Sequence, residues 1–151
     1  MSKPFKTTIC EGIAELVFDH PPVNAFDSKG WAAIAAEIEA LGGNDDVNVI
    51  IIAAEGRGFC AGVDIKELAA DRNLIVAVNK GNYDTFKAVH LNPKPVIVAV
   101  HGFVLGGGLG ASYVEGRYAS TQAPAIAKPF GGDTINDLND LFSDNTFSDN
   151  T

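Results

Sequence analysis

A glycine-rich segment at 102–110 follows directly on the apolar run PVIVAV, with five glycines in nine positions. Glycines at the start of a helix leave peptide N–H groups unobstructed, and the helix dipole adds partial positive charge there. Such N–H groups stabilise a carbonyl oxygen that gains negative charge, and a site of this kind usually combines donors from two segments. Residues 58–65, GFCAGVDI, are a second segment that follows an apolar run and whose glycines and small side chains leave its backbone N–H groups accessible. The two segments together predict an oxyanion-stabilising site.

Two other interpretations of the glycine run remain open. The glycines could simply permit a tight turn between a strand and a helix. The spacing of Gly102, Gly106 and Gly108 also matches that of a dinucleotide-binding loop, which would make the chain a nucleotide-binding oxidoreductase. That loop should follow the first strand of its unit, whereas here it comes late in the chain. A Tyr-x-x-x-Lys pair is missing as well, since Tyr113 is followed four residues later by Arg117.

Composition predicts one soluble domain with a sizeable core, because 46% of the 151 residues are hydrophobic. The net charge of −8 disfavours nucleic acid and anionic membranes as partners. No secretion signal or membrane-spanning run is evident, so we expect a cytoplasmic protein. Cys10 and Cys60 have neither CxxC spacing nor a histidine nearby, which indicates no disulfide framework and no metal site. We expect both to be buried as small apolar side chains.

The pattern of apolar residues and turn signals predicts an α/β fold with a mainly parallel sheet, whose loops gather at one edge. A tail at 136–151 is acidic, repeats FSDNT in tandem and is expected to be disordered, which leaves 1–135 as the core domain. In chain order, the first predicted elements are a hairpin around Glu11-Gly12, a proline loop at 20–26, and a helix capped by Asp27 or Ser28 and stopped at Gly42-Gly43. A strand at 47–54, covered on both faces, comes next. It is followed by a helical segment at 65–91, broken near 71–73 and weakened at Gly81, and by a strand at 95–100.

Two motifs taken together resemble the crotonase, or enoyl-CoA hydratase/isomerase, superfamily. They are GRGFCAGVDIKEL at 56–68 and PKPVIVAVHGFVLGGG at 93–108, and HPPVNAF at 20–26 is similar to the family's loop before its first long helix. The resemblance covers about residues 6–108. It implies a spiral of repeated β-β-α turns, truncated here and followed by the tail. It also implies a role in acyl-CoA metabolism, with homotrimers or hexamers as the family's assemblies.

The resemblance implies that the backbone N–H groups of Ala61 and Gly107 bind the thioester oxygen of an acyl-CoA. Coenzyme A would enter as part of the substrate, and no permanently bound cofactor is expected. Substrate-binding residues by resemblance are Asn24, Ala25, Phe59, Gly62, Asp64, Ile65, Lys66, Gly106 and Gly108.

The two glutamates that hydratases of this family use are replaced, by Gly110 and by Phe130 in an ungapped reading. Neither replacement can transfer a proton, which argues against glutamate-dependent hydration. His101, Glu67 and Glu115 are the remaining acid/base candidates. Each also has a structural interpretation: Glu67 on an exposed turn and His101 hydrogen-bonded at the strand-to-turn corner, with Asp64 as a helix cap. A catalytically silent fragment that binds acyl-CoA or a homologue is therefore the alternative to an enzyme.

Overall fold

The computed structural model describes residues 3–108. The predictions for Gly110, Glu115, Phe130 and the segment 136–151 lie outside the described residues. The strands are β1 (Phe5–Cys10), β2 (Ile13–Phe18), β3 (Ala25–Phe26), β4 (Val49–Ala54), β5 (Gly62–Val63) and β6 (Val96–Val98), and the helices are α1 (Ser28–Gly42), α2 (Ile65–Ala70), the 3-10 turn η1 (Arg72–Leu74) and α3 (Ile75–His90).

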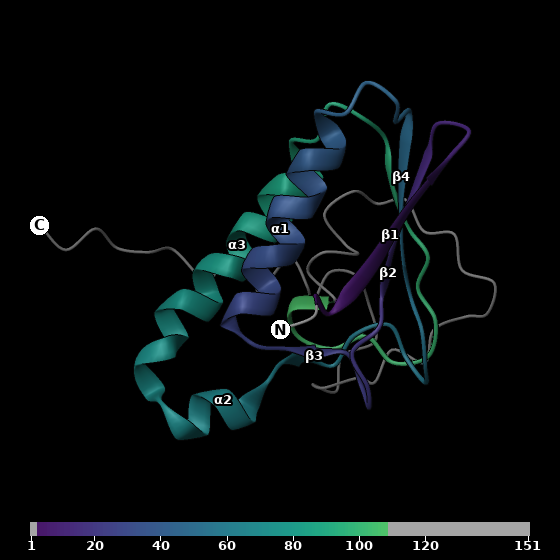
Figure 1. The fold of residues 1–151 in the computed structure, drawn as a ribbon. Helices are drawn as coiled ribbons and strands as arrows, with labels where there is room; N and C mark the ends of the chain where they lie inside the picture. The colour runs from purple at the N-terminus through teal and green to yellow at the C-terminus, as the bar shows by residue number, and fades with distance from the viewer. Residues whose placement is uncertain (1–2, 109–151) are drawn as a thin grey trace, which may run out of the picture.

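A four-stranded sheet carries α1 and α3 on one face (Figure 1). Its strand order is β1-β2-β4-β6, with β1 and β2 antiparallel and the β2/β4 and β4/β6 pairs parallel. The mixed α/β class and the largely parallel sheet were predicted from the sequence. Strands β3 and β5 form a separate short parallel pair beside this sheet. No helix within residues 3–108 is long and apolar enough to cross a membrane.

The predicted hairpin is confirmed, and its turn has a clear conformational cause. Glu11 and Gly12 adopt φ values of 50° and 81°, so both central residues lie in the left-handed region. Positive φ at both positions is typical of the two-residue turn whose twist matches that of the flanking strands. Cys10, at the end of β1, is exposed, so the prediction that both cysteines are buried is wrong for Cys10 and right for Cys60.

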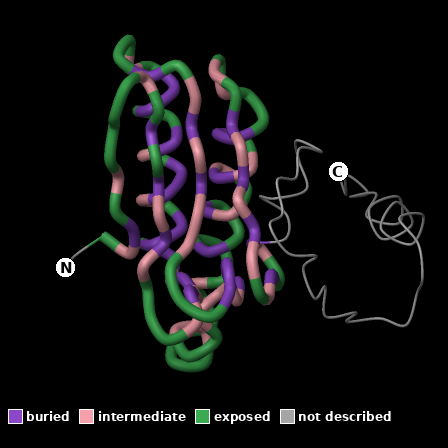
Figure 2. Tube along the Cα trace, turned by 90° about the vertical axis from the view of Figure 1, so that its right-hand side faces the viewer, coloured by how far each residue is buried: buried purple, intermediate pink, exposed green. Residues whose placement is uncertain are grey.

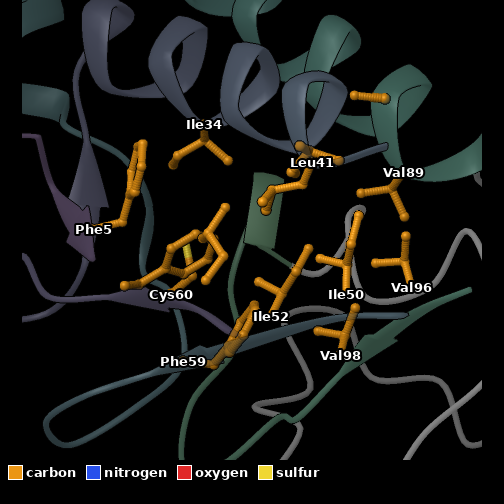
Figure 3. Packing of buried hydrophobic residues seen from close by; sticks show 14 of the residues in the cluster. Phe5, Ile34, Leu41, Ile50, Ile52, Phe59, Cys60, Val89, Val96 and Val98 are labelled. Atoms are coloured by element: carbon orange, nitrogen blue, oxygen red, sulfur yellow. The ribbon is translucent and has the colours of Figure 1, made fainter. Parts of the chain in front are cut away.

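Helix α1 begins and ends where the sequence predicted. The side chain of its N-cap, Asp27, accepts a hydrogen bond from the Gly30 N–H at 2.6 Å, and Gly43 follows the last turn as the C-cap. The apolar stripe faces the sheet, where its side chains meet those of β4 and β6 (Figure 3). The buried members of the stripe are those expected from helical spacing: Trp31, Ile34, Ala35, Ile38 and Leu41.

The helical region after β5 is broken at the predicted place, and it is continuous at Gly81. The chain leaves α2 at Ala70, passes through η1 and continues as α3. Gly81 is buried inside α3, where a Cβ atom would lie 2.8 Å from the Trp31 Cβ. The glycine therefore permits α3 to approach α1 closely, and α3 continues through it without a break.

Strand β4 alternates between two environments instead of being buried on both sides. Ile50 and Ile52 are fully buried toward the helices, while Val49 and Ile51 are only partly covered. Figure 2 views the molecule from the side of the sheet, and buried and intermediate positions alternate along its strands. The apolar run alone could not reveal this alternation, because both faces carry β-branched or small residues.

Candidate active site

The two glycine-bearing segments lie side by side, as the sequence predicted. The Phe59 N–H donates to the carbonyls of His101 and Phe103 at 2.9 and 3.0 Å. The Leu105 N–H donates to the Cys60 carbonyl at 2.9 Å, and an isolated parallel bridge joins Cys60 to Val104. These bonds hold the loop after β4 against the loop after β6 at one edge of the sheet.

Gly62 lies at a close approach of the two segments. Its φ is +90°, in the left-handed region that favours glycine, and a Cβ atom there would lie 3.2 Å from the Leu105 carbonyl oxygen and 3.6 Å from the Gly107 nitrogen. A side chain at this position would therefore press directly on the backbone that leads into the glycine run.

Gly107 provides an open backbone donor at this junction. The chain turns helical at Gly107, so its N–H is among those that lack an acceptor within the helix. Within residues 3–108, neither the Gly106 nor the Gly107 N–H makes a hydrogen bond. The Cα of Gly107 rests against the Asn82 Oδ1 and the Trp31 indole, and the latter would lie 2.9 Å from a Cβ atom. Glycine is therefore required here by space.

The Ala61 N–H, the other expected oxyanion donor, is occupied in this structure. It donates to the carbonyls of Val23 and Asn24, at 3.1 and 3.2 Å. The cause is the parallel pairing of β3 with β5, which brings the loop before β3 against the residue that precedes Gly62. Within the described residues, the Gly106 and Gly107 N–H groups at the junction are open, whereas the Ala61 N–H is shared between two carbonyls.

Asn24 holds the proline loop in place through its own side chain. The residue is buried, with 3% exposed, and has a φ of 52°. Its Oδ1 accepts from the His20 N–H at 2.8 Å, and its Nδ2 donates to the carbonyls of Glu55 and Gly58 at 2.9 and 3.1 Å. Both amide protons are used, so the side chain that was expected to bind substrate serves as an internal link between two loops.

The other predicted substrate-binding residues divide between core and surface. Phe59 is fully buried in the hydrophobic core (Figure 3). Its ring packs against that of Phe18, with ring centroids 5.2 Å apart. Ile65 and Lys66 are exposed at the start of α2. Asp64 accepts a hydrogen bond from the Lys66 N–H at 2.9 Å, which confirms it as the helix cap. The remaining three are a half-buried Ala25 in β3, an exposed Gly106 and a buried Gly108.

Two of the three acid/base candidates have internal partners, and Glu115 lies outside the described residues. Both carboxylate oxygens of Glu67 accept hydrogen bonds from Ser28, one from its N–H and one from its hydroxyl, each at 2.8 Å. Glu67, in α2, is thus half-buried against the first residue of α1. The expectation that it lies on an exposed turn is wrong. The Nε2 of His101 lies 3.1 Å from the Gly56 carbonyl oxygen, which confirms the hydrogen bond expected at that corner.

Cys60 lies within the junction but is not a nucleophile at neutral pH. Burial raises the pKa of its thiol to about 11, against the opposing effect of backbone hydrogen bonds. One of these comes from the Gly62 N–H, 3.2 Å from the Sγ. Because the thiolate is the reactive form, the protonated thiol acts here as a packing group.

Sequence reasoning missed the contribution of the helices to this junction. Asn82 reaches Gly107 from α3, and Trp31 reaches it from α1. The Trp31 Nε1 is buried and has no hydrogen-bond partner within the described part of the chain. The helical spacing placed Trp31 in the core, but no sequence signal shows that its indole meets a loop more than seventy residues further along the chain.

The chain matches the enoyl-CoA hydratase/isomerase family over residues 8–130, and it belongs to that family. It is 45% identical over 106 residues to the (7aS)-7a-methyl-1,5-dioxo-2,3,5,6,7,7a-hexahydro-1H-indene-carboxyl-CoA hydrolase of Mycobacterium tuberculosis, covering 69% of this chain and 43% of the relative. It is 47% identical to the hydrolase of the same name from Rhodococcus jostii, covering 69% of this chain and 41% of the relative.

A solved enoyl-CoA hydratase from Mycobacterium smegmatis has the same fold, with a TM-score of 0.63 and 29% sequence identity. The match covers 68% of this chain and 42% of that structure. The chain therefore spans about two fifths of the length of the relatives it matches.

Proposed function

We propose that this chain binds an acyl-CoA thioester and polarises its carbonyl group through backbone N–H donors, with Gly107 as the first and Ala61 as the second. The observation that carries the proposal is the open Gly107 N–H at the junction of two hydrogen-bonded glycine segments. Membership of a family whose relatives are named for CoA thioesters supports the choice of ligand. Coenzyme A is then part of the substrate.

The chemistry follows from where charge develops. When a nucleophile attacks a thioester carbonyl, or a proton leaves the neighbouring carbon, negative charge accumulates on the carbonyl oxygen. Fixed N–H dipoles stabilise that charge without reorganising, and one such donor typically contributes about 10²–10³ in rate. The Ala61 N–H can join Gly107 because its hydrogen bond is divided between two neutral carbonyls, and a developing oxyanion is a stronger acceptor than either.

The reaction class we propose is hydrolytic. The relatives with 45% and 47% identity are named as CoA hydrolases. Gly110 and Phe130 stand where we expect the two glutamates of a hydratase, and neither side chain can move a proton. A hydrolase still needs the oxyanion donors, because its intermediate also carries charge on the carbonyl oxygen.

A second candidate, binding without turnover, is favoured by a different observation. The Ala61 N–H, the Glu67 carboxylate and the His101 Nε2 are all engaged with internal partners. A junction with open backbone donors at the glycine run and no free proton-transfer group among these residues could retain a thioester without transforming it.

Two measurements on the full chain separate these candidates. Calorimetric titration compares acetyl-CoA and crotonyl-CoA with free CoA, and mass spectrometry follows the same thioesters and a bicyclic oxo-acyl-CoA over time. Turnover supports the enzyme, whereas binding that favours the thioester over free CoA without turnover supports the binding module. A natively folded chain that neither distinguishes thioester from free CoA nor turns any of them over would contradict both.

A further inference from the structure

We propose that Asn82 is a specificity-determining residue: its side-chain oxygen accepts a hydrogen bond from a hydroxyl group that lies close to the thioester carbonyl on the acyl chain. The inference deepens the proposed function and rests on it, because Gly107 is the thioester donor there. It predicts that a hydroxyacyl-CoA binds more tightly than the matching saturated acyl-CoA.

The orientation of the Asn82 amide group follows from its neighbour in the helix. In α3, the Asn82 Nδ2 donates to the Val78 carbonyl at 3.1 Å. A carbonyl oxygen can only accept a hydrogen bond, so the amide nitrogen faces Val78 and the amide oxygen points away from it. That oxygen, Oδ1, makes no hydrogen bond within residues 3–108. The side chain therefore presents an unused acceptor.

The Oδ1 of Asn82 lies directly against the glycine run. It rests on the Gly107 Cα, in the space that a Cβ atom at this position would need. The Gly107 N–H makes no hydrogen bond within the described residues, and the neighbouring Gly106 is exposed. Asn82 itself is half-buried, so a ligand seated on the glycine run can reach its oxygen. One donor and one acceptor are thus open at a single residue.

The two open groups require different partners. A thioester carbonyl oxygen is an acceptor, so it pairs with the Gly107 N–H and is repelled by the Asn82 Oδ1. The Oδ1 needs an O–H or N–H donor, which a saturated acyl chain lacks and a hydroxyacyl chain has. Because both protein groups meet at Gly107, the carbonyl and the hydroxyl must be neighbouring groups of the ligand, as in a 3-hydroxyacyl thioester.

Among the described side chains nearest to the glycine run, Asn82 offers the strong acceptor. Those nearest to Gly107 and Gly108 belong to Asn82, Trp31 and Cys60. The indole N–H of Trp31 can only donate. Cys60 carries a protonated thiol, since burial raises its pKa to about 11, and thiol sulfur is a weak acceptor. A hydroxyl placed here would therefore bind to Asn82.

The surroundings of Asn82 on α3 are apolar. Phe86 lies one turn after it and is half-buried, and Ile75 lies two turns before it and is 44% exposed. Residues at this spacing share one face of a helix. A single polar oxygen on an otherwise apolar wall is the arrangement by which binding sites fix the orientation of a ligand.

Calorimetric titration of the full chain tests the assignment. The probes are butyryl-CoA and the two enantiomers of 3-hydroxybutyryl-CoA, which differ from it only by the hydroxyl. We expect one enantiomer to bind wild type roughly three- to tenfold more tightly than butyryl-CoA, as one added hydrogen bond predicts.

Variants at Asn82 separate the acceptor from the shape. Asn82→Leu keeps a similar size and removes the acceptor, so the two kinds of thioester should bind within about twofold of each other. Asn82→Asp keeps an acceptor and should retain the preference for the hydroxyl or increase it, because a charged acceptor binds a hydroxyl more strongly. Comparing two affinities within one variant cancels any general weakening of the fold.

Asn92 provides a matched control in the same chain. It is also half-buried, and its Nδ2 also donates to a backbone carbonyl, that of Ile38, at 3.1 Å. It follows the C-terminal end of α3 and lies beside Gly42 of α1, away from the glycine run. Asn92→Leu should therefore leave the hydroxyl preference at its wild-type value.

Each alternative result has a definite meaning. A wild-type chain that binds butyryl-CoA and both hydroxyl-bearing probes equally would overturn the inference and leave water as the partner of Oδ1. A preference that survives in Asn82→Leu would assign the hydroxyl to another group, and would overturn it as well. A natively folded chain that binds none of the three thioesters refutes the proposed function itself, and the inference falls with it.

Discussion

Gly62 and Gly56 form a matched pair for testing the junction. Both adopt a strongly positive φ, +90° and +88°, so alanine at either site forces an L-residue into the left-handed region. They differ in their surroundings. A Cβ at Gly62 would lie 3.2 Å from the Leu105 carbonyl oxygen, whereas nothing lies within 4 Å of a Cβ at Gly56. The difference between the two alanine variants therefore isolates the contact across the junction.

The magnitudes can be worked out for each variant. Backbone strain costs about 1–2 kcal/mol at either site, and the smaller entropy of an unfolded alanine chain returns roughly 0.4–1 kcal/mol. Gly56→Ala should thus lower the free energy of unfolding by about 1 kcal/mol. Gly62→Ala adds an overpacking cost of about 1–3 kcal/mol, because backbone atoms must give way. Its total should reach about 2–4 kcal/mol.

The assay is urea unfolding followed by tryptophan fluorescence, combined with thioester turnover or affinity at a temperature where both variants are folded. Moving the Gly107 N–H by a few tenths of an ångström should lower the rate about tenfold or less, since a 1 Å error costs about 10². The rate of Gly56→Ala should stay within about twofold of wild type, because its Cβ would touch nothing and would not move the Gly107 N–H. Equal stabilities and equal rates for the two variants would refute the close approach of Gly62 to the glycine run.

Three further predictions concern the helices and the buried thiol. Gly81→Ala should destabilise the chain by about 1–3 kcal/mol in urea, although alanine is the better helix former, because its Cβ meets Trp31; a stabilised variant would contradict the described packing. Glu67→Ala should cost about 1–3 kcal/mol by leaving the Ser28 N–H and hydroxyl without their acceptor, and Glu67→Gln should recover part of it; equal unfolding midpoints for the two variants would count against this link. Burial raises the pKa of Cys60 from 9.0 to about 11, so the unfolded chain releases a proton that the folded chain keeps, and stability should fall as pH rises from 9 toward 11. Cys60→Ala should lack this component of the pH dependence, and identical curves for both proteins would disprove it.

Periodicity and turn chemistry predicted most of the described fold. The hairpin, α1 with its cap and buried stripe, and the break after α2 all depend on residues close together in sequence. Gly81 shows where such reasoning fails. From local propensity it weakens a helix, but in the fold it permits contact with Trp31, fifty residues earlier in the chain.

The candidate site was predictable in its location but not in its hydrogen bonds. Glycine spacing after two apolar strands was enough to bring the segments together, because parallel strands end at one edge. The sequence could not show that the Ala61 N–H meets two carbonyls of the proline loop. Nor could it show that the Asn24 amide group and the Glu67 carboxylate form internal hydrogen bonds to Glu55, Gly58 and Ser28, since these bonds join residues more than thirty positions apart.

The carbonyl stretching frequency of a bound thioester tests the central claim most directly. Isotope-edited infrared difference spectra of a ¹³C=O-labelled acyl-CoA would be recorded in water, bound to the wild-type chain, and bound to a chain in which an ester replaces the peptide bond at Gly107 and so removes its N–H. Polarisation by backbone donors predicts a shift to lower frequency on binding to wild type, and a clearly smaller shift with the ester. A bound thioester whose frequency equals that in water, or is unaffected by loss of the Gly107 N–H, would contradict the account.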